Sequence, residues 1–180
     1  MAPPGVLRPR NIVTRGQQYV MVRPIAPADA ALLVTLFHRL SPESRWRRFL
    51  QLLPDLSDAQ LWPHAQRLAA IDRCRDEALI ATMIEGGAAH AVGVARLARE
   101  TATATMAEVA LVVRDDCQGE GLGRILLAQL IQVARWRGLH GLWGLMAAEN
   151  TAMGHLVHSC GERVTMSIDH GEMKITIALL

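Results

Sequence analysis

A glycine-rich segment between two apolar runs constrains the fold of this chain more than any other feature. Residues 109–113 (VALVV) have the length and composition of a buried strand. The segment QGEGLG follows at residues 118–123, and from about residue 121 to 137 the apolar residues recur with the helical period until Gly138. The sequence therefore predicts a strand, a tight loop and a helix in direct succession.

Backbone chemistry gives this loop a preferred ligand. Glycines allow backbone amides to approach a ligand closely and to adopt positive φ angles. The first amides of a helix lack intrahelical acceptors, and the helix end carries partial positive charge, so phosphate oxygens are favoured there. The residues alone predict a phosphate or pyrophosphate site, and a glycine turn without a ligand is the alternative.

Two familiar phosphate-binding folds do not match the segment. A P-loop needs a lysine followed by serine or threonine after its last glycine, whereas this chain has Arg124 and Ile125. A dinucleotide-binding fold places its loop after the first strand, with an acidic residue about twenty positions further on. Here several apolar runs precede the loop, and the residues around Trp143 include no acid.

The remaining pattern predicts a single α+β unit. Ser41 and Ser57 are expected to cap helices, with Pro42 at a first helical position, and Pro63 is expected to mark an irregular turn. Gly86 and Gly87 are expected to connect a hairpin. Strands are expected over residues 19–23, 79–84, 91–97, 102–113, 142–147, 163–168 and 173–180. Helices are expected over residues 28–40, 57–67, 121–137 and 150–158, and a further helix is expected to begin at residue 42. One strand–helix–strand unit within a mostly antiparallel sheet gives a mixed α+β sandwich.

Length and composition fit one domain. The chain has 180 residues, of which 51% are apolar, so a core can form without disulfides or a metal. Residues 1–17 contain three arginines and no acidic residue, and we expect a flexible tail there, with a transit peptide as the alternative. Residues 18–180 are expected to form the domain. No run approaches the roughly 18 apolar residues that span a bilayer.

Charge and side-chain chemistry exclude several functions. A net charge of +2 and 4% aromatic residues argue against nucleic-acid binding, although the basic residues comprise eighteen arginines and one lysine, Lys174. The cysteines at 74, 117 and 160 are odd in number and well separated, as expected of reduced thiols in a cytoplasmic protein. The histidines show no metal-ligand spacing, so no metal site is predicted.

The loop and its surroundings resemble a known superfamily. Gln118, Gly121 and Gly123, between an apolar strand and an amphipathic helix, resemble the pyrophosphate loop of the GNAT superfamily of acyl-CoA-dependent N-acetyltransferases. Glu149-Asn150 and the segment to Gly161 resemble its asparagine-bearing helix. Upstream, Val22 to Ile25, Ser41 to Phe49 and Ile71 to Ala78 resemble bacterial protein-lysine acetyltransferase domains. The resemblance covers roughly residues 19–179.

The resemblance implies a GNAT fold, with a mixed, mostly antiparallel sheet and helices on both faces, and direct acetyl transfer from acetyl-CoA as co-substrate. Acetyl-CoA would lie where the strand ending at Val113 separates from the strand around 142–147. The backbone of the first strand would pair with the pantetheine arm, loop amides would hold the pyrophosphate, and Arg124 would either add a charged contact or be inert. The implied cofactor-binding residues are Leu111, Val112, Val113, Gln118, Gly119, Glu120, Gly121, Leu122, Gly123, Arg124 and Asn150.

Glu108 is the candidate catalytic residue. It precedes five apolar residues in the strand, where a carboxylate needs solvent or a partner, and the wet end of a strand is the simple explanation. An alkylammonium with a pKa near ~10.4 must lose a proton before it attacks a thioester. Matching protein-lysine acetyltransferases place a glutamate base at this position, which favours Glu108 as general base.

A general acid for the departing CoA thiolate is missing from the expected position. Many superfamily members have a tyrosine seven residues after the asparagine, where this chain has Val157. His155, His158, Ser159 and Cys160 are weak substitutes, and a thiolate can leave without an enzymic acid. Cys117 beside the loop has no identifiable base, so we interpret it as an ordinary thiol.

The acceptor remains open between two chemistries. A lysine side chain on another protein is favoured, a small amine is the alternative within enzymes, and a non-catalytic acyl-CoA sensor is the alternative outside them. No nucleic-acid or membrane partner is expected, and both a monomer and a dimer fit the sequence.

Overall fold

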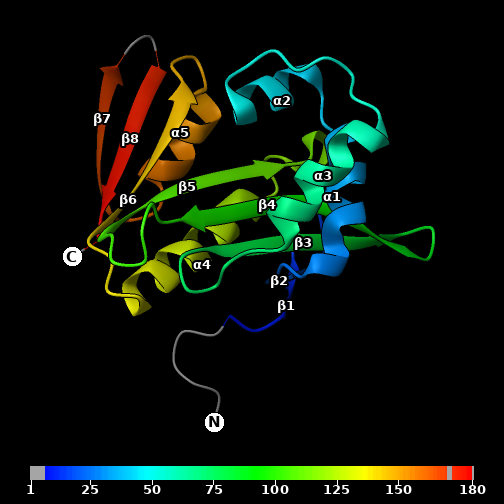
Figure 1. Cartoon of the computed structure of the whole chain (residues 1–180), viewed down its shortest axis with the longest axis horizontal. Helices are drawn as coiled ribbons and strands as arrows, with labels where there is room; N and C mark the ends of the chain where they lie inside the picture. The colour runs from blue at the N-terminus through cyan, green and yellow to red at the C-terminus, as the bar shows by residue number, and fades with distance from the viewer. Residues whose placement is uncertain (1–6, 170–171, 180) are drawn as a thin grey trace.

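One eight-stranded sheet organises the chain. The computed structural model describes residues 7–169 and 172–179. Its sheet has the order β1-β2-β3-β4-β5-β6-β8-β7, and every neighbouring pair is antiparallel except β5–β6 (Figure 1). The strands are β1 Arg10–Val13, β2 Tyr19–Pro24, β3 Glu77–Glu85, β4 Ala88–Ala98, β5 Met106–Val113, β6 Gly141–Ala147, β7 Arg163–Asp169 and β8 Glu172–Ala178.

Helices cover both faces of this sheet and bury two apolar clusters. The cluster on one face joins α1 (Ala30–His38) and α3 (Asp58–Ala69) to strand residues such as Ile80. The cluster on the other face joins α4 (Leu122–Trp136) and Val157 of α5 (Thr151–His158) to residues such as Leu79. The fold is therefore α+β with helices on both faces, as predicted.

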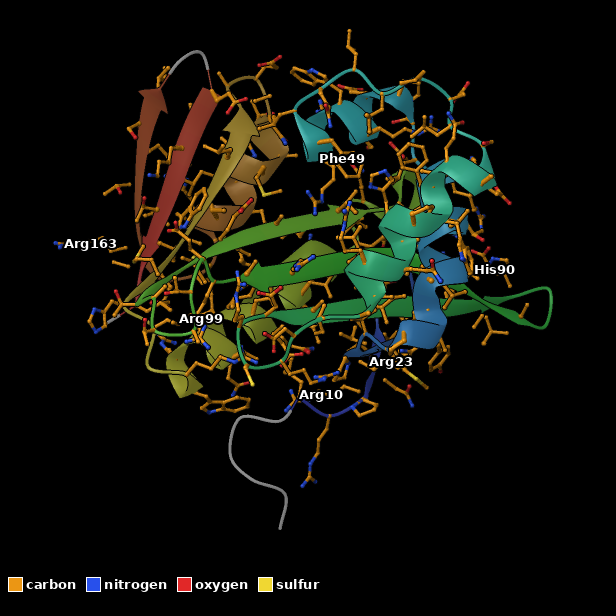
Figure 2. The ribbon with its side chains drawn as sticks, viewed as in Figure 1. Arg10, Arg23, Phe49, His90, Arg99 and Arg163 are labelled. Atoms are coloured by element: carbon orange, nitrogen blue, oxygen red, sulfur yellow. The ribbon has the colours of Figure 1, made fainter. Side chains whose placement is uncertain are left out.

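Local sequence explains how the helices begin. Ser41 accepts a hydrogen bond from the amide of Ser44 at 3.1 Å, and Pro42 occupies the first position of α2 (Pro42–Phe49). Ser57 begins α3 with a capping box that Gln60 completes. Phe49, at the end of α2, lies on the side of that helix that faces the sheet (Figure 2). The caps predicted at Ser41 and Ser57 are confirmed.

The hairpin between β3 and β4 also forms as predicted. Gly86 and Gly87 both have positive φ angles, 59° and 84°, which fit the two-residue turn that matches the twist of paired strands. The strands extend beyond their predicted ends because Glu77 pairs with Leu97 and Glu85 with Ala88.

Three local expectations are wrong. Arg10–Val13, expected in a tail over residues 1–17, form β1 and pair with β2 from Arg10↔Val22 to Val13↔Tyr19, while residues 1–6 lie outside the described part. The strand expected from residue 102 begins at Met106, because Arg75 and Arg99 bind carbonyls of the preceding turn. Pro63 lies inside α3, where its exposed position leaves the carbonyl one turn back to water.

The terminal hairpin is described only in part. β7 and β8 pair from Arg163↔Ala178 to Asp169↔Glu172, as the alternating pattern predicts. Residues 170 and 171 of the expected turn lie outside the described residues. Among the helices that the structure describes, none is long and apolar enough to cross a membrane.

Candidate active site

The sheet opens between its two parallel strands. β5 and β6 pair only from Met106↔Gly141 to Glu108↔Trp143, and Figure 1 shows the strands diverging beyond that point. Gly144 follows the last residue of β6 that pairs with β5, and a Cβ added there would lie 2.7 Å from the carbonyl oxygen of Val109. Glycine at 144 therefore permits the pairing that ends immediately before the opening.

Two cavities occupy this opening. A groove of about 430 Å³ runs along the end of β5, the glycine loop, the start of α4 and α5. A smaller cavity of about 50 Å³ passes between the diverging strands and contains Val109, Ala110 and Trp143 in its wall. Of the predicted cofactor-binding residues, those that line the larger groove are Leu111, Val112, Val113, Gln118, Gly119, Gly121, Gly123, Arg124 and Asn150.

The free side of β5 presents backbone groups to the opening. The amide of Arg114 donates to the carbonyl of Val92, and the β4–β5 register is unbroken from Gly93↔Val113 to Ala98↔Glu108. Hydrogen-bonded pairs alternate along an antiparallel ladder, so Val112 and Ala110 bond to β4. The N–H and C=O groups of Leu111 and the N–H of Val113 therefore point toward the opening, where an extended ligand can pair with them, whereas the C=O of Val113 accepts from Gln118.

The glycine loop has the conformation that an anion site requires. Gly119 and Gly121 have φ angles of 76° and 88°, which L side chains rarely adopt. Gly121 caps α4, so the first amides of that fifteen-residue helix face the groove that Gly123 and Arg124 line. The loop fits a pyrophosphate through its backbone and the helix end.

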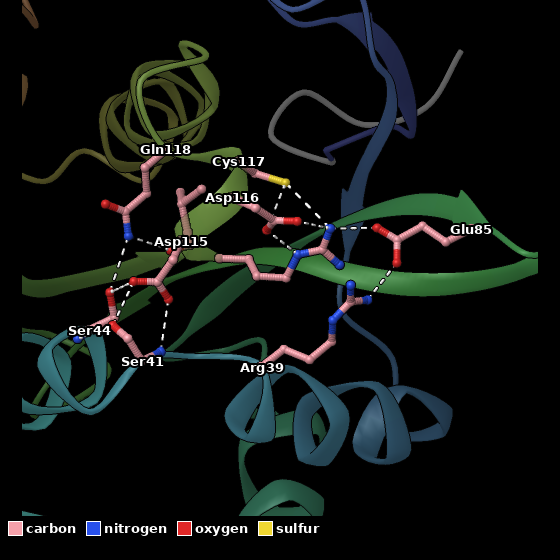
Figure 3. Close-up of polar contacts among 10 residues, drawn as sticks. Arg39, Ser41, Ser44, Glu85, Asp115, Asp116, Cys117 and Gln118 are labelled. Atoms are coloured by element: carbon pink, nitrogen blue, oxygen red, sulfur yellow. Dashed lines mark hydrogen bonds and ion pairs between the residues drawn. The ribbon is translucent and has the colours of Figure 1, made fainter.

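The side chain of Gln118, although exposed, is bound to other residues of the protein. Its amide nitrogen donates to the carbonyl of Val113 at 3.0 Å and to the hydroxyl of Ser44 at 3.2 Å (Figure 3). The side chain therefore ties the loop to the end of β5 and to α2. This contact gives a structural reason for glutamine at the start of the loop.

Two predicted cofactor-binding residues lie apart from the groove lining. The side chain of Leu122 is buried in the core, and the carboxylate of Glu120 accepts a hydrogen bond from the amide of Gly16. Any contact of these two residues with a ligand would therefore come from the backbone. The carbonyl of Glu120 also accepts from the amide of Arg15 at 3.2 Å, which brings Arg15 to the groove.

Four arginines line the larger groove, and sequence reasoning identified only Arg124. Arg15 reaches it from the segment after β1, and Arg47 and Arg48 reach it from α2. Arg47 and Arg48 also line the smaller cavity. Guanidinium groups bind phosphate oxygens through charge-assisted hydrogen bonds, so this lining suits a polyphosphate ligand.

Glu108 lies where β5 and β6 separate. It is the last residue of β5 paired with β6, it is exposed, and its Cα partner across the parallel pair is Trp143. Burial lowers the pKa of Arg48, the attraction of Glu108 opposes that shift, and Arg96 adds to it. The positive charge of Arg48 is therefore attracted by the carboxylate of Glu108.

Asn150 and α5 close the groove on the other side. The side-chain oxygen of Asn150 accepts from the amide of Met153 at 3.1 Å and so caps α5. Because the cap uses only this oxygen, the amide nitrogen can donate to a ligand in the cavities that Asn150 lines. Val157, at the position where the resemblance implies a tyrosine, is buried in the wall of the smaller cavity.

The other candidate proton donors have different surroundings. His155 and Ser159 line the larger groove, where the Ser159 hydroxyl donates to the carbonyl of Leu156 at 2.7 Å. The Nδ1 atom of His158 lies 2.9 Å from the carbonyl of Gly154. Cys160 packs against the core.

Cys117 lines the larger groove, and its surroundings favour the protonated thiol. Burial raises its pKa, Asp116 raises it further, and Arg114 only partly opposes this. The neighbouring arginine is occupied, because Arg114 binds Asp116 and Glu85 in a network that extends to Arg39 (Figure 3). Within the described residues, no group of three or more His, Cys, Asp or Glu side chains could hold a metal ion.

A mostly antiparallel sheet that opens between two parallel strands, with a glycine loop and a helix N-terminus at the opening, defines a protein that binds acyl-CoA for acyl transfer. The chain belongs to the GNAT acetyltransferase family, because the family model described as "Acetyltransferase (GNAT) domain" matches residues 20–163. The resemblance noted in the sequence is therefore confirmed. The protein is an acetyl-CoA-dependent N-acetyltransferase.

Relatives and solved structures agree with this assignment. The chain is 33% identical over 144 residues to an acetyltransferase of Pseudomonas aeruginosa, covering 80% of this chain and 75% of that protein. It is 30% identical over 155 residues to the acetyltransferase Pat of Mycolicibacterium smegmatis, covering 86% of this chain but only 44% of that protein. The GNAT domain of S. lividans PAT, known from a crystal structure, is 29% identical with a TM-score of 0.81, and the match covers 95% of this chain and 97% of that chain.

Proposed function

We propose that this enzyme transfers the acetyl group of acetyl-CoA to the side-chain amine of a protein lysine, with Glu108 as general base. The observation that carries the proposal is the place of Glu108: an exposed carboxylate at the last paired position before β5 and β6 diverge. The similarity to Pat, which is named an acetyltransferase, and to the GNAT domain of PAT supports the same class of reaction.

The proposed reaction divides between the cofactor groove and Glu108. The amides at the start of α4 and the groove arginines bind the phosphates, and the free edge of β5 pairs with the pantetheine arm. Glu108 takes a proton from the acceptor ammonium, directly or through a water molecule, and the free amine attacks the thioester carbonyl. The CoA thiolate then leaves and takes a proton from solvent, because Val157 has none to donate.

The open position of Glu108 favours a protein acceptor over a small amine. A small-amine enzyme needs a closed acceptor pocket, whereas a lysine on a folded protein needs access from outside. Glu108 is exposed, and it lies beside the two cavities and outside their linings. A lysine side chain can therefore approach it from solvent.

Glu108→Gln tests the base. We expect turnover, measured as thiol release with acetyl-CoA and a lysine peptide, to fall about 100-fold or more, because general-base catalysis contributes about 10²–10⁴-fold. Coenzyme A affinity, measured by calorimetry, should stay unchanged. Glu100→Gln, which alters an exposed glutamate in the turn before β5, is the matched control. Unchanged turnover in Glu108→Gln would exclude Glu108 as the base.

The acceptor class is tested with the unaltered protein. We expect kcat/KM for lysine-containing peptides to exceed that for free small amines at the same pH. The reverse order would assign the enzyme to small-amine acetylation and would leave the role of Glu108 intact.

A further inference from the structure

The single lysine of the chain lies beside the proposed acceptor site. Among nineteen basic residues, only Lys174 carries an amine that could accept an acetyl group. It is exposed on β8, where its Cα partner on β6 is Leu145. Its Nζ atom lies over the ring of Trp143, 5.4 Å from the ring centroid.

The sheet register places this amine on the same face as Glu108. Directly paired residues of neighbouring strands share a face, and so do residues two apart on one strand. Glu108 pairs with Trp143, and Leu145, two residues further along β6, pairs with Lys174. The three side chains of Glu108, Trp143 and Lys174 therefore occupy adjacent strands on one side of the sheet.

The ring of Trp143 links Lys174 to the opening between β5 and β6. Trp143 and Leu145 both line the smaller cavity, together with Arg48. Lys174 lies toward the end of β6 at which the two strands have separated, which is the direction of the cofactor groove. Its four-carbon stem is flexible, so the ammonium can move from the ring face to the mouth of the cavity.

We propose that Lys174 is a self-acetylation site, at which the enzyme transfers an acetyl group to its own side chain. This inference rests on the proposed transfer to lysine. The Nζ atom forms a bond to the acetyl carbon, and the bond between that carbon and the CoA sulfur breaks. The ammonium loses two protons, the first to Glu108; one ends on the CoA thiol and the other in solvent.

Self-acetylation would change the acceptor face. The modified side chain has no charge, so its cation–π contact with Trp143 is lost. The acceptor face loses one positive charge, and an acetamide remains beside the cavity mouth.

Mass spectrometry tests the proposal because the chain offers one side-chain amine. The full chain is incubated with acetyl-CoA, and its digested peptides distinguish Lys174 from the N-terminal amine. We expect one acetyl group at residue 174 in the unaltered protein and none there in Lys174→Arg, whose fold is checked by thermal unfolding. The rate per molecule should not change with protein concentration, because donor and acceptor belong to one chain.

Comparisons with variants, with the unfolded chain, with an added peptide and between protein concentrations decide the result. Glu108→Gln should acetylate Lys174 about 100-fold more slowly if the same base acts, and Trp143→Leu should slow it several-fold. Equal rates in the unaltered protein, Glu108→Gln and urea-unfolded chain would mean chemical acetylation and would overturn the inference. If an added lysine peptide is acetylated but Lys174 is not, the self-acetylation inference is overturned and the proposed function stands. If neither is acetylated, the proposed function is overturned as well. A rate that rises with protein concentration would refute transfer within one chain.

Discussion

Asp115 connects the helix that carries two groove arginines to the cofactor loop. Its carboxylate accepts hydrogen bonds from the Ser41 amide at 2.9 Å, the Ser41 hydroxyl at 2.6 Å and the Ser44 hydroxyl at 2.7 Å (Figure 3). Burial alone would raise the pKa of Asp115, but these bonds outweigh it and lower the pKa, so the group is an ionised acceptor. The carboxylate therefore holds the start of α2 against the segment after β5.

Removal of this carboxylate should loosen α2. A hydrogen bond to a charged group contributes about 1.5–3 kcal/mol when buried, and Asp115 is partly exposed, so we assign about 1 kcal/mol to each of its bonds. We expect Asp115→Ala to lower the free energy of unfolding by about 2–3 kcal/mol. For a domain of this size that corresponds to a fall in Tm of about 4–12 °C.

A double-mutant cycle measures the contribution of the hydrogen bond between Asp115 and Ser44. In a double-mutant cycle of Asp115→Ala and Ser44→Ala, urea unfolding should give an interaction energy of about 0.5–1.5 kcal/mol. Coenzyme A affinity should also fall about 10-fold in Asp115→Ala, because α2 carries Arg47 and Arg48 into the groove. A single charge-assisted contact of about 1.4 kcal/mol corresponds to that factor.

Asp55, which binds α2 from the following loop, is a control for the loss of a carboxylate that contacts this helix. Asp55 pairs with Arg45 of α2 at 2.7 Å but is almost fully exposed, and an exposed ion pair contributes little. Asp55→Ala should change stability by less than about 1 kcal/mol and leave coenzyme A affinity unaltered. Zero coupling between Asp115 and Ser44, or equal coenzyme A affinity in Asp115→Ala and Asp55→Ala, would refute the reasoning.

Two further predictions concern the opening and its supports. Gly144→Ala should destabilise the protein by more than about 1 kcal/mol and reduce coenzyme A affinity, because its Cβ would lie 2.7 Å from the carbonyl of Val109; unchanged urea unfolding would contradict this. Hydrogen bonds from Arg114 and Arg39 lower the pKa of Glu85 to about 2, below its ordinary 4.5. The stabilisation of the folded protein by ionised Glu85 should be complete above pH 4.5 and lost as the pH falls toward 2. The difference in unfolding free energy between the unaltered protein and Glu85→Gln should therefore shrink over that pH range. A difference that does not change with pH would be inconsistent with this.

The parts of the fold that depend on residues close together in the sequence could be predicted from the sequence. The Ser41 hydroxyl accepts from the amide of Ser44, and the amide and hydroxyl of Ser57 donate to the side-chain oxygen of Gln60. Gly121 supplies a positive φ angle where the loop enters α4. The boundaries were less accurate where distant contacts decide them. Residues 102–105 are compatible with a strand by composition, but arginine side chains from residues 75 and 99 hold the turn there.

The strand β1 shows why local sequence does not predict the structure of residues 10–13. Arg10–Val13 is too short and too polar to give a strand period of its own, and its backbone partners all belong to β2. The pairing of these strands, together with the contacts of Arg15 and Gly16 to Glu120, fixes the position of the segment. No pattern within residues 1–17 encodes those contacts.

The charged residues of the active site also differ in how far local sequence predicts their positions. Arg124 follows the glycine loop directly, so its place at the groove could be predicted from local order. Arg47 and Arg48 have the spacing of a solvated helix face, and only the packing of α2 against β5 and β6 brings them over the opening. Glu108 is intermediate: its polarity marks it within an apolar strand, but its position where the strands diverge is a property of the register with β6. The conformation of the glycine loop, which fits a pyrophosphate, is therefore encoded locally. The charges around the loop depend instead on tertiary contacts between segments more than thirty residues apart. For that reason, variants at Asp115 should alter coenzyme A binding although the loop glycines are unchanged.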